Sequence, residues 1–198
     1  MKLYYSPTSP YVRKVMACAI TRELEARIQL HPTNPHASPA DLVADNPTAK
    51  VPCLITDDGL SLYDSPVICE VLDSLGDAPA LFPASGAARW RALKFQAMGD
   101  GILDAAVPCR GELGRPKEAA RDAAIARYKA AMSRTVDALE ADPPHRHVDI
   151  GSIAVACALG YLDFRYASDP WRPGHPKLAG WYEEFSKNPG IARTVPKE

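Results

Sequence analysis

The strongest constraint on this chain is a change of hydrophobic pattern close to residue 82. Before that point, short apolar runs alternate with turn-forming residues, a pattern typical of strands and short helices. After it, apolar residues recur every three or four positions, as they do on amphipathic helices. The sequence therefore predicts an α/β domain over residues 1–76, a linker over 77–88 and an all-α helical bundle over 89–198.

The first domain is expected to contain a small mixed sheet of four strands. Lys2–Tyr5 is the first strand, and Ser9 followed by Pro10 fits the N-cap and first residue of a helix. A second strand is expected around residues 28–30. The order strand, helix, strand, strand, strand, helix predicts helices packed on a four-stranded sheet.

A hairpin and a helix complete this domain. Residues 51–56 and 60–63 are expected to form antiparallel strands, because residues 57–59, Asp-Asp-Gly, make a three-residue turn whose glycine can take the left-handed conformation. Ser65 is the expected N-cap of the next helix, which Gly76 ends.

The rest of the chain predicts a helical bundle. The expected helices are centred on residues 90–101, 125–139, 153–164 and 178–185. The third is apolar on nearly every face, so it should be the buried central helix. Pro108 is expected to interrupt and kink the helix that carries it, because proline breaks the helical hydrogen-bond ladder.

Composition excludes several kinds of partner. The 23 lysines and arginines nearly balance the 24 aspartates and glutamates, which gives a formal net charge of -1. No overall field therefore favours nucleic acid or an anionic membrane. No apolar run approaches the roughly 20 residues that span a bilayer, and the start lacks a secretory signal, so we expect a cytoplasmic protein.

The cysteines argue against disulfide and zinc frameworks. They are odd in number, scattered and never paired as C-x-x-C, so buried thiols are expected. Cys109 follows a proline near charged residues, and the sequence does not decide whether its thiol is buried or accessible. His145 and His147 have no nearby cysteine, so we expect no metal site.

Three short segments of the first domain could carry chemistry. Residues 8–10, Thr-Ser-Pro, place hydroxyls at a helix start, where unpaired N–H groups and the helix dipole favour an anion. Residues 50–52, Lys-Val-Pro, lead into a strand, and residues 64–65, Asp-Ser, open a helix. Taken alone, each segment is better explained as a structural boundary, with Ser9 simply an N-cap.

Taken together, the segments resemble a known family. The first domain contains LYYSPTSPYVRKV, NPTAKVPCLITDDG and LYDSPVICEVL followed by LFP, and the second contains GILDAAV and DIGSIAVACALGYLDFR. These stretches are similar to the cytosolic glutathione S-transferase family, in particular to bacterial members with a Ser-Pro active-site motif. The resemblance implies a thioredoxin-like domain that binds glutathione, then an all-helical domain that contributes the electrophile pocket, in a homodimer.

The resemblance also implies a role for each matching residue. Ser9 would hydrogen-bond the glutathione sulfur, with Thr8 as the competing hydroxyl. Val51 would pair through its backbone with the cysteinyl unit, beside a cis Pro52. The other implied glutathione contacts are Asp64 and Ser65 to the γ-glutamyl group and Lys50 to the glycyl carboxylate. The implied electrophile pocket consists of Pro10, Tyr11, Leu103, Val107 and Arg110.

The implied activity is transfer of glutathione, as co-substrate, to small hydrophobic electrophiles in detoxification. A free thiol with a pKa of about 8.5 is mostly protonated at neutral pH, and lowering that pKa by about two units requires about 2.7 kcal/mol. One hydrogen bond to a charged group contributes roughly 1.5–3 kcal/mol, and a helix N-terminus adds up to about 1 kcal/mol. A hydroxyl at a helix start is therefore sufficient without a metal or a base.

Some features depart from the family or leave alternatives open. Ser9 stands where related thiol transferases have cysteine, which disfavours disulfide chemistry. Asp149 and Ser152 reverse the family's usual capping box, so a weaker cap is expected. Arg110 either orients an anionic substrate or is a surface arginine paired with Glu112 or another acid. The alternative functions are a non-catalytic interaction or regulatory protein with the same fold, and a specialised glutathione-dependent isomerase, dehalogenase or peroxidase.

Overall fold

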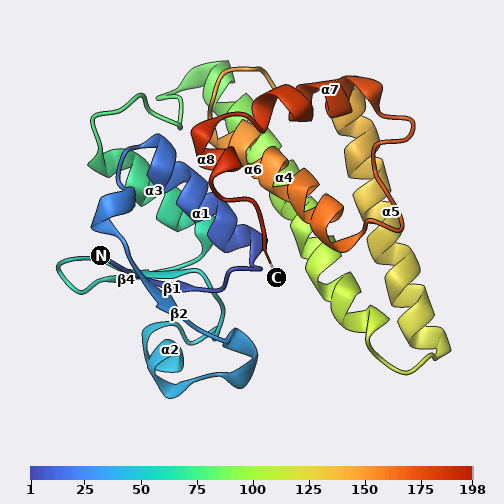
Figure 1. Cartoon of the computed structure of the whole chain (residues 1–198), viewed down its shortest axis with the longest axis horizontal. Helices are drawn as coiled ribbons and strands as arrows, with labels where there is room; N and C mark the ends of the chain where they lie inside the picture. Colours follow the sequence, from blue (N-terminus) through green and yellow to red (C-terminus); the bar gives the residue numbers. More distant parts are fainter. Residues whose placement is uncertain (198) are drawn as a thin grey trace. The chain divides into compact units, whose positions relative to one another are not determined.

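The computed structural model describes residues 1–197, which separate into two compact units. One unit contains residues 1–84 and the residues from Asn188 onward, and the other contains residues 85–187. The sequence predicts the segment after residue 187 as part of the helical domain, whereas it packs with the first unit. Its short helix α8 (Pro189–Ala192) lies against α1 (Pro10–Thr21), as Figure 1 shows.

The first unit is built on a four-stranded sheet in the order β2-β1-β3-β4. Strand β1 (Lys2–Tyr5) is parallel to β2 (Gln29–Pro32) and antiparallel to β3 (Cys53–Ile55), which is antiparallel to β4 (Ser61–Leu62). The predicted mixed sheet and hairpin are therefore confirmed. Strand β3 begins later than expected, because the proline before it has no N–H to donate to a neighbouring strand.

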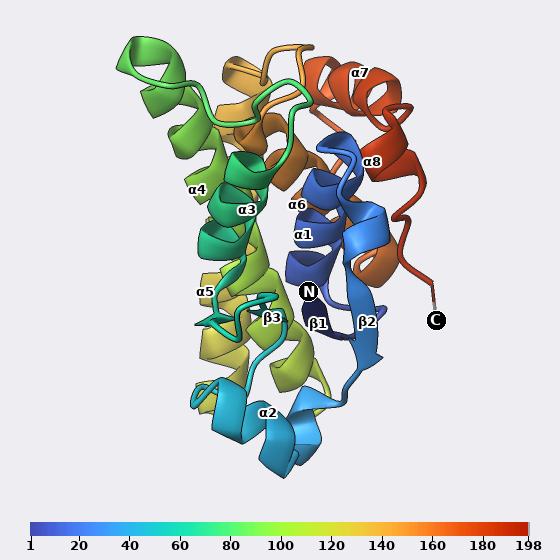
Figure 2. The same cartoon turned by 90° about the vertical axis from the view of Figure 1, so that its left-hand side faces the viewer.

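Helices cover both sides of this sheet. Helices α1 and α3 pack together on one side, and α2 lies on the other (Figures 1 and 2). The fully buried residues Val15 and Ile68 are part of the α1 and α3 core faces. The remaining elements of this unit are α2 (Ala40–Asp45), α3 (Ser65–Leu75) and two 3-10 turns, η1 (Glu25–Arg27) and η2 (Pro35–Ala37).

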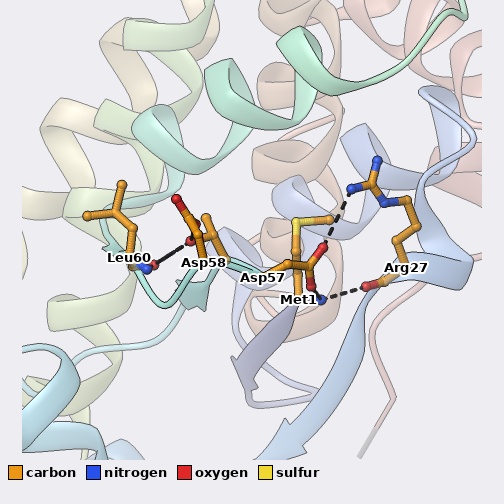
Figure 3. A network of polar contacts seen from close by, with 6 residues as sticks. Met1, Arg27, Asp57, Asp58 and Leu60 are labelled. Atoms are coloured by element: carbon orange, nitrogen blue, oxygen red, sulfur yellow. Dashed lines mark hydrogen bonds and ion pairs between the residues drawn. The ribbon is translucent and has the colours of Figure 1, made fainter.

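Polar contacts tie the β3–β4 turn to the start of β1. Gly59 has a φ of 87°, as the predicted turn requires. The ammonium group of Met1 donates to Asp57 Oδ1 at 2.6 Å and to the Arg27 carbonyl at 3.0 Å, and Arg27 Nη2 lies 3.6 Å from Asp57 Oδ2 (Figure 3). The hydrogen bond from this ammonium is the main reason that the pKa of the Asp57 carboxyl is lowered. The network joins three segments that are distant in sequence.

The second unit is a helical bundle. Its helices are α4 (Gly86–Leu113), α5 (Ala119–Ala141), α6 (Ile150–Arg165) and α7 (Pro176–Phe185). Helix α6 is buried from Ile150 to Leu162, which confirms the predicted central helix. It approaches α4 closely at Gly99, where an added Cβ would lie 2.6 Å from the backbone of Ala154.

Two expectations for this unit need correction. Helix α4 continues through Pro108 to Leu113 instead of being interrupted, because buried residues on both sides of the proline, Ala106 and Cys109, hold it in the bundle. The reversed capping box of α6 is complete: Ser152 N–H donates to Asp149 Oδ1 at 2.7 Å, and Asp149 N–H donates to Ser152 Oγ at 2.9 Å. Within residues 1–197, no helix is both long and apolar enough to cross a membrane.

Candidate functional site

The strand order brings the three predicted segments to one edge of the sheet. The register of β1 against β3 pairs Tyr4 with Cys53, so the residues after β1 run beside those before β3. The antiparallel pairing of β3 with β4 brings the residues after β4 to the same edge. Residues 6–9, 50–52 and 63–65 therefore meet where helices α1 and α3 begin.

Ser9 caps α1, as predicted. Its Oγ accepts a hydrogen bond from the Val12 N–H at 3.3 Å, and residues 1–197 provide no acceptor for its hydroxyl hydrogen. The side chain is half-buried at the helix N-terminus, where the helix dipole favours an anion. Ser9 can therefore donate to a sulfur anion while it still caps the helix. Thr8, the competing hydroxyl, lies in the turn before the helix.

The loop before β3 has the geometry that the resemblance implies. The Val51–Pro52 peptide bond is cis, and both residues are buried. The side chain of Lys50 is exposed beside them. The backbone of Val51 thus lies at the sheet edge, with a lysine cation adjacent to it.

Asn46 is a residue of this site that the sequence analysis missed. It is 1% exposed, and its Nδ2 donates to the Lys50 carbonyl at 2.9 Å. Its Oδ1 accepts from the N–H and the hydroxyl of Thr48 at 3.0 and 2.8 Å. These bonds hold the loop that leads into Val51. The sequence Asn-Pro-Thr is typical of an Asx turn and is the signal that could have identified it.

The third segment opens α3 with a buried hydroxyl. Asp64, and not Ser65, is the N-cap, because Ser65 is already helical and Pro66 occupies the first turn, where proline is favoured. Ser65 is 1% exposed, and its Oγ has no hydrogen-bond partner among residues 1–197. Buried polar groups are normally paired, so this oxygen is suited to a ligand group. The Asp64 side chain is exposed next to it.

The predicted electrophile pocket draws on both units. Pro10 and Tyr11 lie in the first turn of α1, whereas Leu103, Val107 and Arg110 lie along α4. Leu103 is fully buried, and Val107 and Arg110 are exposed. That these two groups line one pocket remains a prediction.

The surroundings of Arg110 and Cys109 on α4 bear on two alternatives that the sequence leaves open. Glu112 pairs with Arg115 at 3.3 Å, so the alternative ion pair with Arg110 is not observed. Cys109, whose environment the sequence left open, is buried, as are the other four cysteines.

The cysteine at the start of β3 is poorly suited to nucleophilic chemistry. Burial raises the pKa of the Cys53 thiol to about 11, so its reactive thiolate is scarce at neutral pH. Within residues 1–197, no group of three or more His, Cys, Asp or Glu side chains could hold a metal ion. The imidazoles of His145 and His147 stack on each other, with centroids 5.1 Å apart.

Comparison with known proteins decides the family. The sequence matches the model of the glutathione S-transferase N-terminal domain over residues 8–75 and that of the C-terminal domain over residues 122–184. The chain belongs to the glutathione S-transferase family. A relative described as the uncharacterized GST-like protein YibF of Escherichia coli K12 is 34% identical, over 99% of this chain and 98% of that protein.

Solved structures of glutathione transferases share this fold. One from Pseudomonas fluorescens Pf-5, with bound glutathione, is 41% identical with a TM-score of 0.92, and the match covers 100% of this chain and 99% of that one. A second from that organism, with bound S-(propanoic acid)-glutathione, is 39% identical with a TM-score of 0.89, over 100% of both chains. A third, from Methylobacillus flagellatus with GSH bound, is 31% identical with a TM-score of 0.89, over 99% of each chain. The predicted family and fold are confirmed.

Proposed function

We propose that this protein is a glutathione S-transferase enzyme that activates the glutathione thiol for attack on small electrophiles. The observation that carries the proposal is the meeting of three segments at one sheet edge, where the hydroxyl hydrogen of Ser9 has no acceptor among residues 1–197. The related transferases with bound glutathione support the same co-substrate here. No metal takes part in the proposed reaction.

Ser9 is the proposed catalytic group. Its hydroxyl donates a hydrogen bond to the sulfur and stabilises the thiolate over the thiol, and the N-terminus of α1 adds to this effect. A hydrogen bond to an anion is worth roughly 1.5–3 kcal/mol, enough to lower a thiol pKa by about one to two units. The thiolate then attacks an electrophile held against it, so that orientation supplies much of the remaining acceleration.

The other residues at the sheet edge hold the tripeptide. The backbone of Val51 pairs with the cysteinyl unit, and the Lys50 ammonium attracts the glycyl carboxylate. Ser65 and Asp64 hold the carboxylate and amino groups of the γ-glutamyl unit, a role that the buried, unpartnered Oγ of Ser65 supports. Each charged end of glutathione is thereby matched by an opposite charge or a donor.

The second substrate is a small electrophile. We assign part of its pocket to Pro10 and Tyr11 in the first turn of α1, which suits an apolar molecule. The related Pseudomonas fluorescens transferase binds glutathione with a propanoic acid group on sulfur. That ligand supports the proposal that electrophiles carrying a carboxylate are substrates of this protein as well. The reaction would then serve a detoxifying or a metabolic role.

Substitution of Ser9 tests the proposed mechanism. We expect Ser9→Ala to raise the pKa of bound glutathione by about two units and to lower turnover of an aryl chloride at pH 7 by about 20- to 100-fold. Thiolate absorbance against pH and steady-state kinetics measure the two effects. Thr8→Ala is the matched control and should stay within about twofold of the wild type.

Other outcomes of this experiment are equally informative. If Thr8→Ala lost activity while Ser9→Ala kept it, Thr8 would be the sulfur contact. If the wild type showed no calorimetric binding of glutathione at millimolar concentration, the enzyme proposal would be wrong and the non-catalytic interaction protein would take its place.

We further propose a cytoplasmic homodimer. The balanced charge of the chain and the burial of all five cysteines fit a reducing compartment. Trp90 on α4 is 66% exposed, which makes this aromatic side chain a candidate for burial in a subunit interface. Sedimentation at micromolar concentration should give a species of twice 21.5 kDa. Trp90→Glu should shift it toward the monomer, and a wild type that sediments only as monomer would contradict the dimer.

A further inference from the structure

A groove lies beside Ser9 within the first unit. It has a volume of about 270 Å³ and runs between α1, β2 and the residues that follow α8. Figures 1 and 2 show those residues running back beside α1. Of the site residues predicted from the sequence, Ser9 alone lines this groove. We name it the Arg13 groove; its lining includes Ser6, Ser9, Val12, Arg13, Leu30 and Lys197.

Arg13 is a buried cation with weak polar contacts. It is 6% exposed, its Nη2 donates to the Ile191 carbonyl at 3.3 Å, and its Nε donates to the Thr194 hydroxyl at 3.5 Å. Both bonds are longer than the usual 2.7–3.2 Å or so. Among residues 1–197, its buried Nη1 has no hydrogen-bond partner and no carboxylate pairs with it.

The other buried arginines are matched by acids. Arg22, the C-cap residue of α1, has its Nε 3.2 Å from Asp73 Oδ1. Arg121, in the second unit, has its Nη1 2.7 Å from Asp122 Oδ1. A buried charge without a counter-ion is costly. The unpaired guanidinium of Arg13 therefore favours an anion in the groove beside it.

The remaining walls define the shape of a suitable ligand. Lys197 adds positive charge at the rim, and the acid in the wall, Glu25, is already paired with Arg193. Apolar side chains from α1 and β2 line the rest, among them Val12, Met16 and Leu30. A molecule with a small apolar body and one carboxylate matches both the charge and the size of this space.

We propose that the Arg13 groove binds the carboxylate of an acid-bearing electrophile, the second substrate of the transferase. This inference rests on the proposed function. Ser9 connects the Arg13 groove with the proposed glutathione site, because it lines the groove and is also the proposed contact of the glutathione sulfur. The carboxylate replaces the two long hydrogen bonds of Arg13 with shorter charge-assisted ones.

The reaction needs no further reactant. The glutathione thiolate forms a C–S bond with the electrophilic carbon, the leaving group departs with the electron pair of its own bond, and the thiol proton is released to water. With a chloroarene as probe, the leaving group is chloride. The carboxylate of the substrate takes no part in bond making and serves only to hold it.

The test compares chloronitrobenzoate with its uncharged methyl ester. Arg13→Gln removes the charge, so KM for the acid should rise by about tenfold or more, while kcat/KM for the ester should stay within about twofold. Arg13→Lys keeps the charge and should recover part of the affinity for the acid. Circular dichroism and the glutathione KM establish that each variant is folded and still binds its co-substrate.

A second pair of variants is independent of the fold around Arg13. Lys197→Gln, at the groove rim, should raise KM for the acid by about two- to fivefold. Lys187→Gln is the matched control: Lys187 is an exposed lysine paired with Glu184 outside the groove, and its loss should leave both substrates unchanged. An unchanged acid KM in folded Arg13→Gln and in Lys197→Gln would overturn the inference, as would equal losses for acid and ester.

Failure of the inference is distinguishable from failure of the proposed function. If the wild type binds glutathione and turns over the ester, but the Arg13 variants leave the acid unaffected, only the groove assignment is wrong. If glutathione does not bind at all, the transferase proposal fails first. Unreactive benzoate should inhibit competitively against chloronitrobenzoate; calorimetric binding of benzoate without such competition would also overturn the assignment.

Discussion

A single amide side chain organises the loop before β3. Asn46 accepts two bonds from Thr48 and donates one to the Lys50 carbonyl. We expect Asn46→Ala to lower the free energy of unfolding by about 1–3 kcal/mol, because buried polar groups lose their partner, and to weaken glutathione binding. Urea denaturation and calorimetry measure both effects.

Asn34→Ala is the control for that experiment. Asn34 forms a comparable Asx turn, with its Oδ1 accepting from the His36 N–H at 3.1 Å, but it is exposed and far in sequence from the site. Its loss should change the unfolding free energy by less than about 0.5 kcal/mol. Equal losses for the two variants would mean that burial of Asn46 is not what matters.

Local sequence predicts some site residues and misses others for physical reasons. Ser9 is predictable because an N-cap depends on its immediate neighbours. The turn formed by Asn46 is equally local, but its bond to Lys50 depends on how the loop folds back. Arg13 is the extreme case, because its partners Ile191 and Thr194 are 178 and 181 positions away.

Among the elements, α6 depends on its N-terminal cap. Asp149→Ala removes the acceptor for the Ser152 N–H, so we expect a loss of about 0.5–2 kcal/mol in the free energy of unfolding. Ser85→Ala is the control, because Ser85 is the N-cap of α4 without a side-chain capping bond, and it should be near neutral. A small effect at Asp149, equal to that at Ser85, would mean that packing alone fixes the start of α6.

The helices and strands themselves are largely predictable from the sequence, whereas the residues at which they begin and end are not. The β3–β4 hairpin follows from one Asp-Asp-Gly turn, and the burial of α6 follows from its continuous apolar run. Helix α4 continues past Pro108 because tertiary packing outweighs the loss of one backbone bond, which a local rule cannot weigh. The predicted N-cap of α3 is one residue too late for a different reason, since two adjacent polar residues, Asp64 and Ser65, can both take that position.

On the scale of the whole molecule, contact between α8 and α1 depends on Gly190. A Cβ at this position would lie 2.7 Å from the Ala17 carbonyl oxygen, so Gly190→Ala should lower the free energy of unfolding by about 1–3 kcal/mol. Gly180→Ala in α7 meets nothing within 4 Å and should be neutral or stabilising by up to about 1 kcal/mol. Thermal or urea unfolding compares the two variants. An unchanged free energy of unfolding in Gly190→Ala would mean that α8 can shift to make room for the added methyl group without loss of stability.

The return of α8 to the first unit makes the helical unit an insertion within the other one. During synthesis, residues 1–84 therefore emerge long before the helix that completes their packing, and we expect them to remain a loosely held intermediate until then. A fragment that stops at residue 84 should be digested by protease far faster than the same residues in the intact chain.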